Sequence, residues 1–447
     1  MMSIKTYHFI CFTLFASLLF SSWFCVFVVA VAWAFQLAHS ILVSTMLARP
    51  RYEGVDERLK REYYAKSSVS ILKPLCGTTP TLYENLRSYF TLKYPSFELI
   101  LCVADDDDEA LRVVKRLQRE FPDVSTIISV GEDDVGINPK LCNMNTGYKV
   151  ANHDLVWIAD ANIVASDAAL HDMVDKCVSG ARLVHQIPWA VSGTSAKPAV
   201  GAMSCGSILE RWYFATAHGR PYTVINNTVC TCLNGMSHLF TKAHMDEIGG
   251  LENFGEFLNE DGEIGLTYDR HGYETAISQY VAVQNIGPIE ISDYVSRRVR
   301  WAKLRNKYPN TAWTTPLELL IDNHLTSMLC LVVLVYYHGV GVGFLVPLHQ
   351  TMWLAVDAAV FMLMDRATAF PNIWQCYRLD WGRVSKRRRG VYFYILNIIE
   401  HYTMWLMREY IAMYIRLQAL ESTDTIVWQD KEIEIPEPEA ADETKVD

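Results

Sequence analysis

The chain has 447 residues, of which 20% are charged and 51% belong to the hydrophobic set. Its mean hydropathy of +0.08 argues against an ordinary soluble enzyme and against a disordered chain. The net charge is −10, but the last 27 residues contain ten acids and two lysines and carry −8 of it. This distribution argues against nucleic acid as a partner. The 11 cysteines include no C-x-x-C pair, which favours reduced thiols over a disulfide framework or a zinc site.

The apolar residues are concentrated at the two ends of the chain. No Lys, Arg, Asp or Glu occurs in residues 9–47, and the densest part, residues 9–35, is longer than the ~20 residues that cross a bilayer. A cleaved signal peptide has an apolar core of only ~7–15 residues. Residues 1–48 are therefore predicted to form an uncleaved membrane anchor.

The second apolar zone, residues 311–420, is predicted to hold the C-terminal spans. Residues 324–348 form one candidate span, and residues 351–364 form a shorter one that contains Asp357. A third candidate covers residues 391–414, although Glu400, Arg408 and Glu409 interrupt it. The alternative for this last segment is an amphipathic helix that lies in the membrane interface.

Basic residues in the short loops predict the orientation in the membrane. Residues 49–61 follow the first span and are rich in Arg and Lys, and a second basic group, residues 378–389, precedes the last candidate span. Because such residues stay on the cytosolic side, the middle of the chain is predicted to face the cytosol. The acidic tail, residues 421–447, is then expected to be disordered and lumenal.

The middle of the chain, residues 63–310, has the pattern of an α/β domain. Short apolar runs at residues 69–75, 97–103, 124–130 and 154–159 read as buried strands. Helical patterns lie between them, at residues 81–93, 108–121 and 141–150. This alternation predicts a mostly parallel sheet, in which ligands bind beyond the carboxyl ends of the strands.

Carboxylates follow two of these strands. The run from Asp105 to Asp108 comes after one strand, and Asp160 with Asn162 comes after another. No G-x-G-x-x-G or Walker lysine motif follows any of them, which suits a nucleotide held through a divalent metal rather than by a glycine loop. Asp160 and Asn162 are the candidate ligands for Mg²⁺ or Mn²⁺. Helix capping is the preferred alternative for Asp105 and Asp106.

Two basic features complete the candidate site. Lys140 lies at the start of a predicted helix, where it can help to hold a diphosphate or can equally be a surface turn residue. Further on, Arg297 and Arg300 share one face of a basic helix that also contains Trp301. Two guanidinium groups can clamp phosphate oxygens, while the alternative is contact with anionic lipid heads.

These motifs together resemble the family 2-type glycosyltransferases, and most closely the ceramide glucosyltransferases of family 21. The resemblance covers residues 69–304 together with the membrane segments at both ends. Six stretches carry it: SILKPLCG (70–77), LILCVADDDDEA (99–110), VGINPK (135–140), DLVWIADANI (154–163), NEDGEIG (259–265) and RRVRW (297–301). The resemblance implies a glycosyltransferase-A-like fold, with a mostly parallel sheet covered by helices on both faces and membrane helices at both ends.

The resemblance also implies an activity, namely transfer of glucose from UDP-glucose to the primary hydroxyl of ceramide with inversion. Asp108 would bind the nucleotide, with Asp107 as the runner-up, and Asp160 would hold metal and diphosphate. Asp261 would be the general base. Arg297, Arg300 and Trp301 would bind the leaving diphosphate and line the acceptor region. The implied location is a Golgi or endoplasmic reticulum membrane, with ceramide and membrane lipid as partners.

Two other functions remain open from the sequence. One is a processive polysaccharide synthase, although such enzymes carry Gln at the position of Arg297 and need a larger membrane channel. The other is an inactive, membrane-anchored scaffold, against which the intact set of Asp160, Asp261 and Arg300 argues. The oligomeric state is not predicted.

Overall fold

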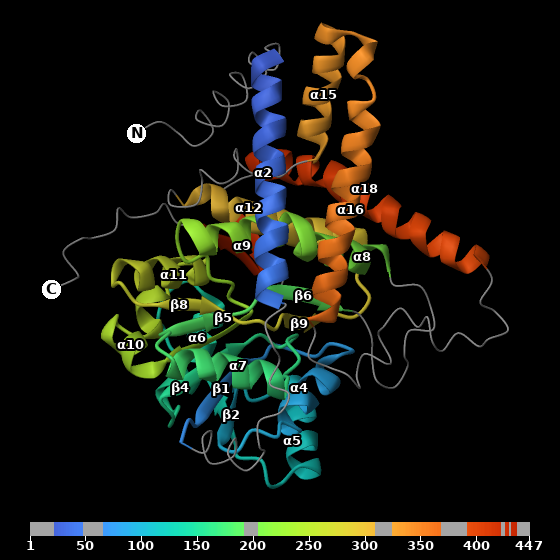
Figure 1. The fold of residues 1–447 in the computed structure, drawn as a ribbon. Coiled ribbons are helices and arrows are strands. Elements are labelled where there is room, and N and C mark those ends of the chain that lie inside the picture. The colour runs from blue at the N-terminus through green and yellow to red at the C-terminus, as the bar shows by residue number, and fades with distance from the viewer. Residues whose placement is uncertain are drawn as a thin grey trace.

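The computed structural model describes residues 22–47, 66–191, 204–308, 324–367, 391–421, 425–428 and 431–435. In Figure 1 an α/β domain lies below a group of upright helices formed by the two ends of the chain. The segments that pack together are therefore far apart in sequence.

Seven strands form the central sheet, in the order β3-β2-β1-β4-β7-β5-β8. β7 runs antiparallel to both of its neighbours, and the other pairings of this sheet are parallel. The strands are β1 (Val69–Pro74), β2 (Phe97–Val103), β3 (Thr126–Val130), β4 (Leu155–Ala159), β5 (Leu183–His185), β7 (Ser237–Thr241) and β8 (Thr275–Ile277). The four strands expected from the sequence are all present, with ends within two residues of those predicted.

Helices cover both faces of this sheet. One apolar cluster buries α4 (Leu82–Phe90), α5 (Ala110–Glu120) and α7 (Asp167–Val178) against one face. A second cluster buries α6 (Pro139–Lys149), α10 (Lys242–Glu247) and α11 (Glu260–Arg270) against the other face. The predicted class, a mostly parallel sheet with helices on both faces, is confirmed.

A second layer joins the sheet to the upright helices. It contains the parallel pair β6 (Pro188–Val191) and β9 (Ala282–Asn285). Its helices are α8 (Cys205–Trp212), the π-helix η1 (Tyr213–Ala217), α9 (Gly219–Thr228) and α12 (Ile291–Lys307). A third apolar cluster runs from this layer into the upright helices, so the two parts share one core.

Three apolar helices stand side by side, namely α2 (Ser22–Leu47), α15 (His324–His338) and α16 (Leu345–Arg366) (Figure 1). Of the described helices, α2 and residues Leu345–Asp365 of α16 are long and apolar enough to cross a membrane. The boundaries differ from those expected. The chain turns at Gly339, where φ is +81°, so residues 324–348 are not one span. The described part of the first helix ends at Leu47, inside the range of residues 1–48 expected for the anchor.

α18 (Val391–Glu421) does not stand beside these helices. It packs on α8 and α12, and in Figure 1 it runs obliquely across the direction of α2, α15 and α16. Several of its apolar side chains are exposed, including Ile398, Tyr410 and Leu417. α18 is not among the described helices that are long and apolar enough to cross a membrane, so the third C-terminal span stays a prediction and the amphipathic alternative also fits this helix. Arg408 and Glu409 of this helix are buried against the rest of the protein. The apolar pattern of a membrane span does not predict two charged residues at such positions.

The expectation that the acidic tail is disordered also fails for the part of it that the structure describes. Strands β10 (Thr425–Trp428) and β11 (Lys431–Glu434) form an antiparallel hairpin. Ile426 and Ile435 are buried in an apolar cluster with α12, so a few apolar side chains overcome the acidic composition. Because α12 belongs to the α/β domain, the hairpin lies on the same side of the upright helices as that domain. The basic groups at residues 49–61 and 378–389 lie outside the described residues.

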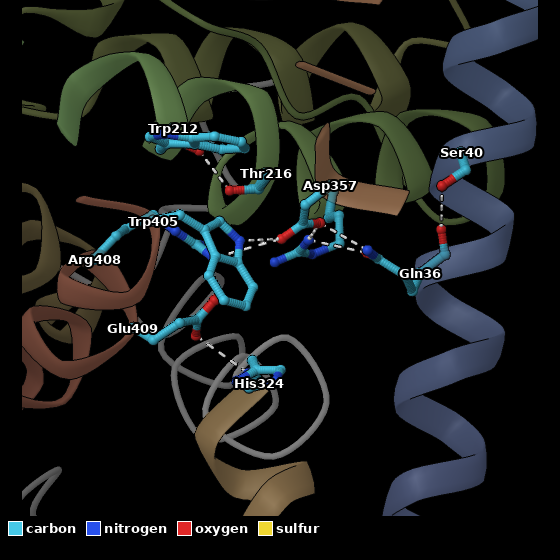
Figure 2. A network of polar contacts seen from close by, with 10 residues as sticks. Gln36, Ser40, Trp212, Thr216, His324, Asp357, Trp405, Arg408 and Glu409 are labelled. Atoms are coloured by element: carbon cyan, nitrogen blue, oxygen red, sulfur yellow. Dashed lines mark hydrogen bonds and ion pairs between the residues drawn. The ribbon is translucent and has the colours of Figure 1, made fainter. Parts of the chain in front are cut away.

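A buried polar network ties the upright helices to the second layer. Asp357 of α16 accepts hydrogen bonds from Gln36 of α2 (2.7 Å), Arg220 of α9 (2.6 Å) and Trp405 of α18 (2.8 Å). Figure 2 shows Gln36, Asp357 and Trp405 converging from three different helices. Arg408 pairs with the neighbouring Glu409, whose other oxygen accepts the backbone N–H of His324 at 3.2 Å. These ionic side chains are 1% exposed or less.

Candidate active site

The carboxyl edge of the sheet brings Lys140 and Asp160 together. Asp160 follows β4, and Lys140 lies in the first turn of α6. The Nζ atom of Lys140 is 3.0 Å from Oδ1 of Asp160 and 3.1 Å from Oε1 of Glu260. It also donates to the backbone carbonyl of Gly235 at 2.8 Å. The lysine is therefore the centre of the site and not a surface turn residue.

The local sequence around Lys140 explains its position. Asn138 caps α6, because its Oδ1 accepts the backbone N–H groups of Lys140 and Leu141, and Pro139 begins the helix. The preceding loop lies against a second loop at Gly255. A Cβ atom added to Gly136, where φ is +139°, would lie 2.5 Å from the carbonyl carbon of Gly255. This close approach needs glycine and brings α6 next to the start of α11.

Burial and charge act on Lys140 in opposite directions. Burial alone lowers the pKa of Lys140, but the adjacent carboxylates of Asp160 and Glu260 outweigh it and raise the pKa above its ordinary value. The lysine therefore stays cationic at neutral pH. The site offers a fixed positive charge to an anionic group that approaches Asp160.

Asp261 lies in the first turn of α11, on the other side of Gly235 from Lys140. Its Oδ2 accepts the backbone N–H of Gly235 at 2.8 Å, and its Oδ1 accepts that of Gly262 at 2.9 Å. Burial, followed by the negative charge of Glu260, raises the pKa of Asp261 to about 6. A carboxylate with a pKa near neutrality can exchange a proton with a hydroxyl group more effectively than an ordinary aspartate.

Lys73 lies beneath Asp160, near the end of β1. Its buried Nζ donates to the backbone carbonyls of Asp160 (2.5 Å) and Ile163 (3.3 Å). The same atom is 4.2 Å from the centre of the Tyr89 ring. Burial lowers the pKa of Lys73 to about 7, although Asp160 opposes the shift. This lysine holds the loop that carries Asp160 and Asn162.

The basic helix α12 contributes three arginines in different environments. Arg298 is buried, 2.5 Å from Oε2 of Glu210, and its guanidinium lies 4.1 Å from the centre of the Trp301 ring. Arg297 is partly exposed and lies 3.5 Å from Oε1 of the same glutamate. Arg298 therefore fastens the helix, while Arg297 keeps an accessible face.

Arg300 and Trp301 lie on the same helix. Burial, together with the positive charges of Arg297 and Arg298, lowers the pKa of Arg300 to about 10. The indole of Trp301 packs near the rings of Phe214 and His218, with ring centroids 6.3 and 6.2 Å away. An anion beside these arginines would relieve their mutual repulsion.

Asp108 lies at the same sheet edge but makes different contacts. Both of its oxygens accept the backbone N–H of Gly77, at 3.1 and 3.0 Å, and Oδ1 also accepts that of Ala110 at 2.7 Å. It joins the loop after β1 to the start of α5. Because β1 separates β2 from β4, Asp108 follows a strand about 10 Å from that of Asp160. Asp107 is exposed.

The residues near Asp160 fit a metal ion that takes most of its ligands from the substrate. Among the described residues, no group of three or more His, Cys, Asp or Glu side chains is placed to hold a metal. The Asp160 side chain is 32% exposed, with only Oδ1 engaged by Lys140, and Asn162 is half-buried beside it. Mg²⁺ commonly uses one or two protein oxygens together with phosphate and water.

Three residues of the site escaped the sequence analysis, namely Glu260, Glu210 and Lys73. Glu260 directly precedes Asp261, but its partner Lys140 is distant in sequence, so no local pattern indicates the pair. Glu210 likewise meets α12 only in the folded chain. Lys73 offered a signal, because a lysine in an otherwise buried strand needs a partner.

Comparisons with known proteins show the family of this chain. Residues 24–441 match the profile of glycosyl transferase family 21. Ceramide glucosyltransferase 3 of Caenorhabditis elegans is 31% identical over 365 residues, which is 81% of this chain and 71% of that protein. The ceramide glucosyltransferase of Pyricularia oryzae is 28% identical and aligns over 71% of this chain and 70% of its own length.

Among solved structures, a mannosyltransferase of Pyrobaculum calidifontis in complex with GDP-Man and Mn²⁺ is 15% identical, with a TM-score of 0.46. The alignment covers 90% of this chain and 99% of the other. Family membership itself rests on the profile match and on the curated relatives. The chain therefore belongs to glycosyltransferase family 21 and is a glycosyltransferase.

Proposed function

We propose that this enzyme transfers glucose from UDP-glucose to the primary hydroxyl of ceramide and releases β-glucosylceramide and UDP. The observation that carries the proposal is the cluster of Lys140, Asp160 and Asp261 at one sheet edge, where Arg297 of α12 interacts electrostatically with Asp160. The names of the family 21 relatives support glucose and ceramide as the substrates.

The proposed mechanism assigns the proton to Asp261. The hydroxyl of ceramide is a weak nucleophile at neutral pH, so a carboxylate within hydrogen-bond reach takes its proton as the oxygen attacks the sugar. The attack comes from the face opposite the diphosphate, which inverts the configuration at the anomeric carbon. The N–H groups of Gly235 and Gly262 hold the Asp261 carboxylate in place.

Negative charge develops on UDP as it leaves. Lys140 supplies a fixed cation beside Asp160, and Arg297 and Arg300 offer guanidinium groups to the phosphate oxygens. Asp160 and Asn162 would hold Mg²⁺ or Mn²⁺, which would neutralise diphosphate charge when bound. We assign Asp108 to the nucleotide moiety and Trp301 to the acceptor side, in keeping with the family resemblance.

We further propose that the protein is anchored in a Golgi or endoplasmic reticulum membrane, with residues 1–48 as the anchor and residues 63–310 as the cytosolic catalytic domain. Two apolar helices of sufficient length support a multi-pass arrangement. Ceramide is almost insoluble in water, so an enzyme at the bilayer surface gains access to it directly. The packing of α12 against α18 supports entry of the lipid at this level.

The decisive experiment incubates membranes that contain the full chain with ceramide and labelled UDP-glucose or UDP-galactose, and identifies the product. We expect one glucose on ceramide in β configuration. Asp261→Asn should abolish turnover and retain binding of UDP-glucose, because it removes the base but keeps the shape of the site. A growing polymer, transfer of galactose alone, or near-normal turnover of the variant would contradict the proposal.

A further inference from the structure

The C-terminal hairpin is folded back onto the catalytic domain. Ile426 of β10 is 2% exposed and Ile435, just after β11, is 3% exposed. The neighbouring Val427 is 63% exposed, so one face of the hairpin is buried and the other is in solvent. This alternation marks a strand that packs against a specific surface.

That surface is a small apolar cluster, which we call the hairpin cluster. Its fully buried members are Leu258, Leu304, Tyr308, Ile426 and Ile435. Leu304 lies in the last turn of α12 and Tyr308 caps its end, while Leu258 lies two residues before the start of α11. Ile137, just before α6, packs at its edge. The cluster therefore touches α12, which carries the arginines, and the two segments that lead into α6 with Lys140 and into α11 with Asp261.

Polar contacts connect the hairpin cluster to the site. The Tyr308 hydroxyl accepts the backbone N–H of Leu258 at 3.2 Å. Asn138 donates from Nδ2 to the carbonyl of Phe257 at 2.8 Å and to Oε2 of Glu260 at 3.1 Å. The Nζ atom of Lys303 on α12 donates to the carbonyl of Thr425 at 2.8 Å, which fixes the hairpin to the helix.

We propose that the C-terminal hairpin is a positioning element of the active site, in which Ile426 and Ile435 hold Leu258 and Tyr308 and thereby set the start of α11 against α6. The consequence for catalysis rests on the function proposed above for Asp261. Asp261 is three residues from Leu258, so a shift of this segment moves its carboxylate. A displacement of about 1 Å at a catalytic group can cost up to roughly a hundredfold in rate.

The test compares Ile426→Ser with the matched control Val427→Ser in the full-length protein. Serine at the buried position opens a cavity and adds an unpaired hydroxyl, whereas serine at the exposed position changes little. We expect Ile426→Ser to lower kcat at least tenfold and to speed hydrogen exchange in a peptide that covers residues 257–263, with a peptide from β1 unchanged. Val427→Ser should match the wild type. The volume-conserving Ile426→Leu should keep both kcat and the hydrogen exchange of residues 257–263 close to the wild-type values.

Two outcomes would overturn the inference. One is unchanged exchange over residues 257–263 in Ile426→Ser. The other is faster exchange spread equally over β1, which would show a general loss of stability. Ile435→Ser and the milder Ile426→Val keep the test available if Ile426→Ser does not fold. A wild-type protein that makes no glucosylceramide would refute the proposed function. Hydrogen exchange requires no substrate, so it would still test whether the hairpin positions residues 257–263.

Discussion

The charges around Gly235 act as a unit at the scale of single residues. Its carbonyl accepts Lys140 and its N–H is donated to Asp261, so one peptide unit fixes the cation and the carboxylate relative to each other. Glu260 lies beside both, because it pairs with Lys140 and raises the pKa of Asp261. The proton affinity of the proposed base therefore depends on its immediate neighbour.

This dependence predicts the pH profile of the enzyme. A base works in its deprotonated form, and the pKa of Asp261 is about 6, so kcat/KM should fall as the pH drops through that value. Glu260→Gln removes a charge that raises this pKa and should move the acid limb to lower pH. The limb should stay in place in Glu263→Gln, which changes an acid on the same helix that pairs with Arg270. Full pH–rate profiles of the three proteins would measure the shift.

Buried histidines near the site do not obscure that measurement. Burial, the largest influence on both groups, lowers the pKa of His218 and of His238 to about 3, well below the predicted limb. An acid limb that stays unchanged in Glu260→Gln would argue against Asp261 as the titrating base.

The sequence indicates some residues of the site and not others, for a physical reason. Asp160 and Asp261 stand at element ends in recognisable motifs, and Lys140 follows an Asn-Pro helix start. Their partners come from distant segments, as with Glu260 for Lys140. Asp108 accepts backbone N–H groups of the loop after β1 and of the start of α5, and its motif does not indicate these donors. A motif locates a carboxylate but does not show which donors reach it.

At the scale of elements, α12 is held by a buried carboxylate that the sequence does not reveal. Glu210 is fully buried between Arg297 and Arg298, and Arg298 lies between the rings of Tyr213 and Trp301. The ion pair between Glu210 and Arg298 orients α12 so that Arg297 faces the candidate active site. The long helix was predictable from its basic pattern, whereas its rotation depends on a residue 88 positions away.

Removal of this carboxylate should destabilise the protein strongly. Glu210→Gln leaves the Arg298 guanidinium buried without a counter-charge, which costs about 3–5 kcal/mol in the free energy of unfolding. Thermal unfolding in detergent would measure the loss. Arg116→Gln is the comparator, because Arg116 and its partner Glu120 form a surface ion pair, and it should leave the unfolding temperature close to that of the wild type. Equal stability of Glu210→Gln and the wild type would show that the aromatic contacts alone hold α12.

Some elements cannot be predicted from the periodicity of their own sequence. Strands β1 to β4 are mostly apolar runs of five to seven residues and were predicted, while β5, β6, β8 and β9 have only three or four residues each. Such short strands form because a neighbouring strand is already in place, so their sequences carry little periodicity. α18 keeps two interpretations because some of its apolar residues are buried against the protein and others are exposed.

At the scale of the whole molecule, the network around Asp357 joins the two halves of the chain. Gln36, Arg220 and Trp405 contribute donors from α2, α9 and α18, and Asp357 accepts from all of them (Figure 2). Arg408 lies 3.8 Å from the same carboxylate. The upright helices are thereby fixed to α9, which begins beside the ring of His218.

Graded variants test this connection. Asp357→Asn removes the negative charge between Arg220 and Arg408 and should cost about 3–5 kcal/mol of stability. Trp405→Phe removes one hydrogen bond and should cost about 0.5–1.5 kcal/mol. Thermal unfolding of the detergent-solubilised protein measures both, and a similar small loss in the two variants would mean that the charge contributes nothing beyond one hydrogen bond.

The hairpin also predicts on which side of the membrane residues 425–447 lie. Its strands pack on α12, and residues 436–447 are acidic and contain no apolar run. A bilayer crossing needs about 20 apolar residues, so these residues should stay on the side of the proposed catalytic domain. An epitope tag after Asp447 should therefore be digested by protease in sealed, cytosol-side-out vesicles, together with epitopes of the catalytic domain. A lumenal marker protein must stay intact in the same sample. Protection of the C-terminal tag alone would mean that α18 crosses the bilayer and that the hairpin does not pack on α12.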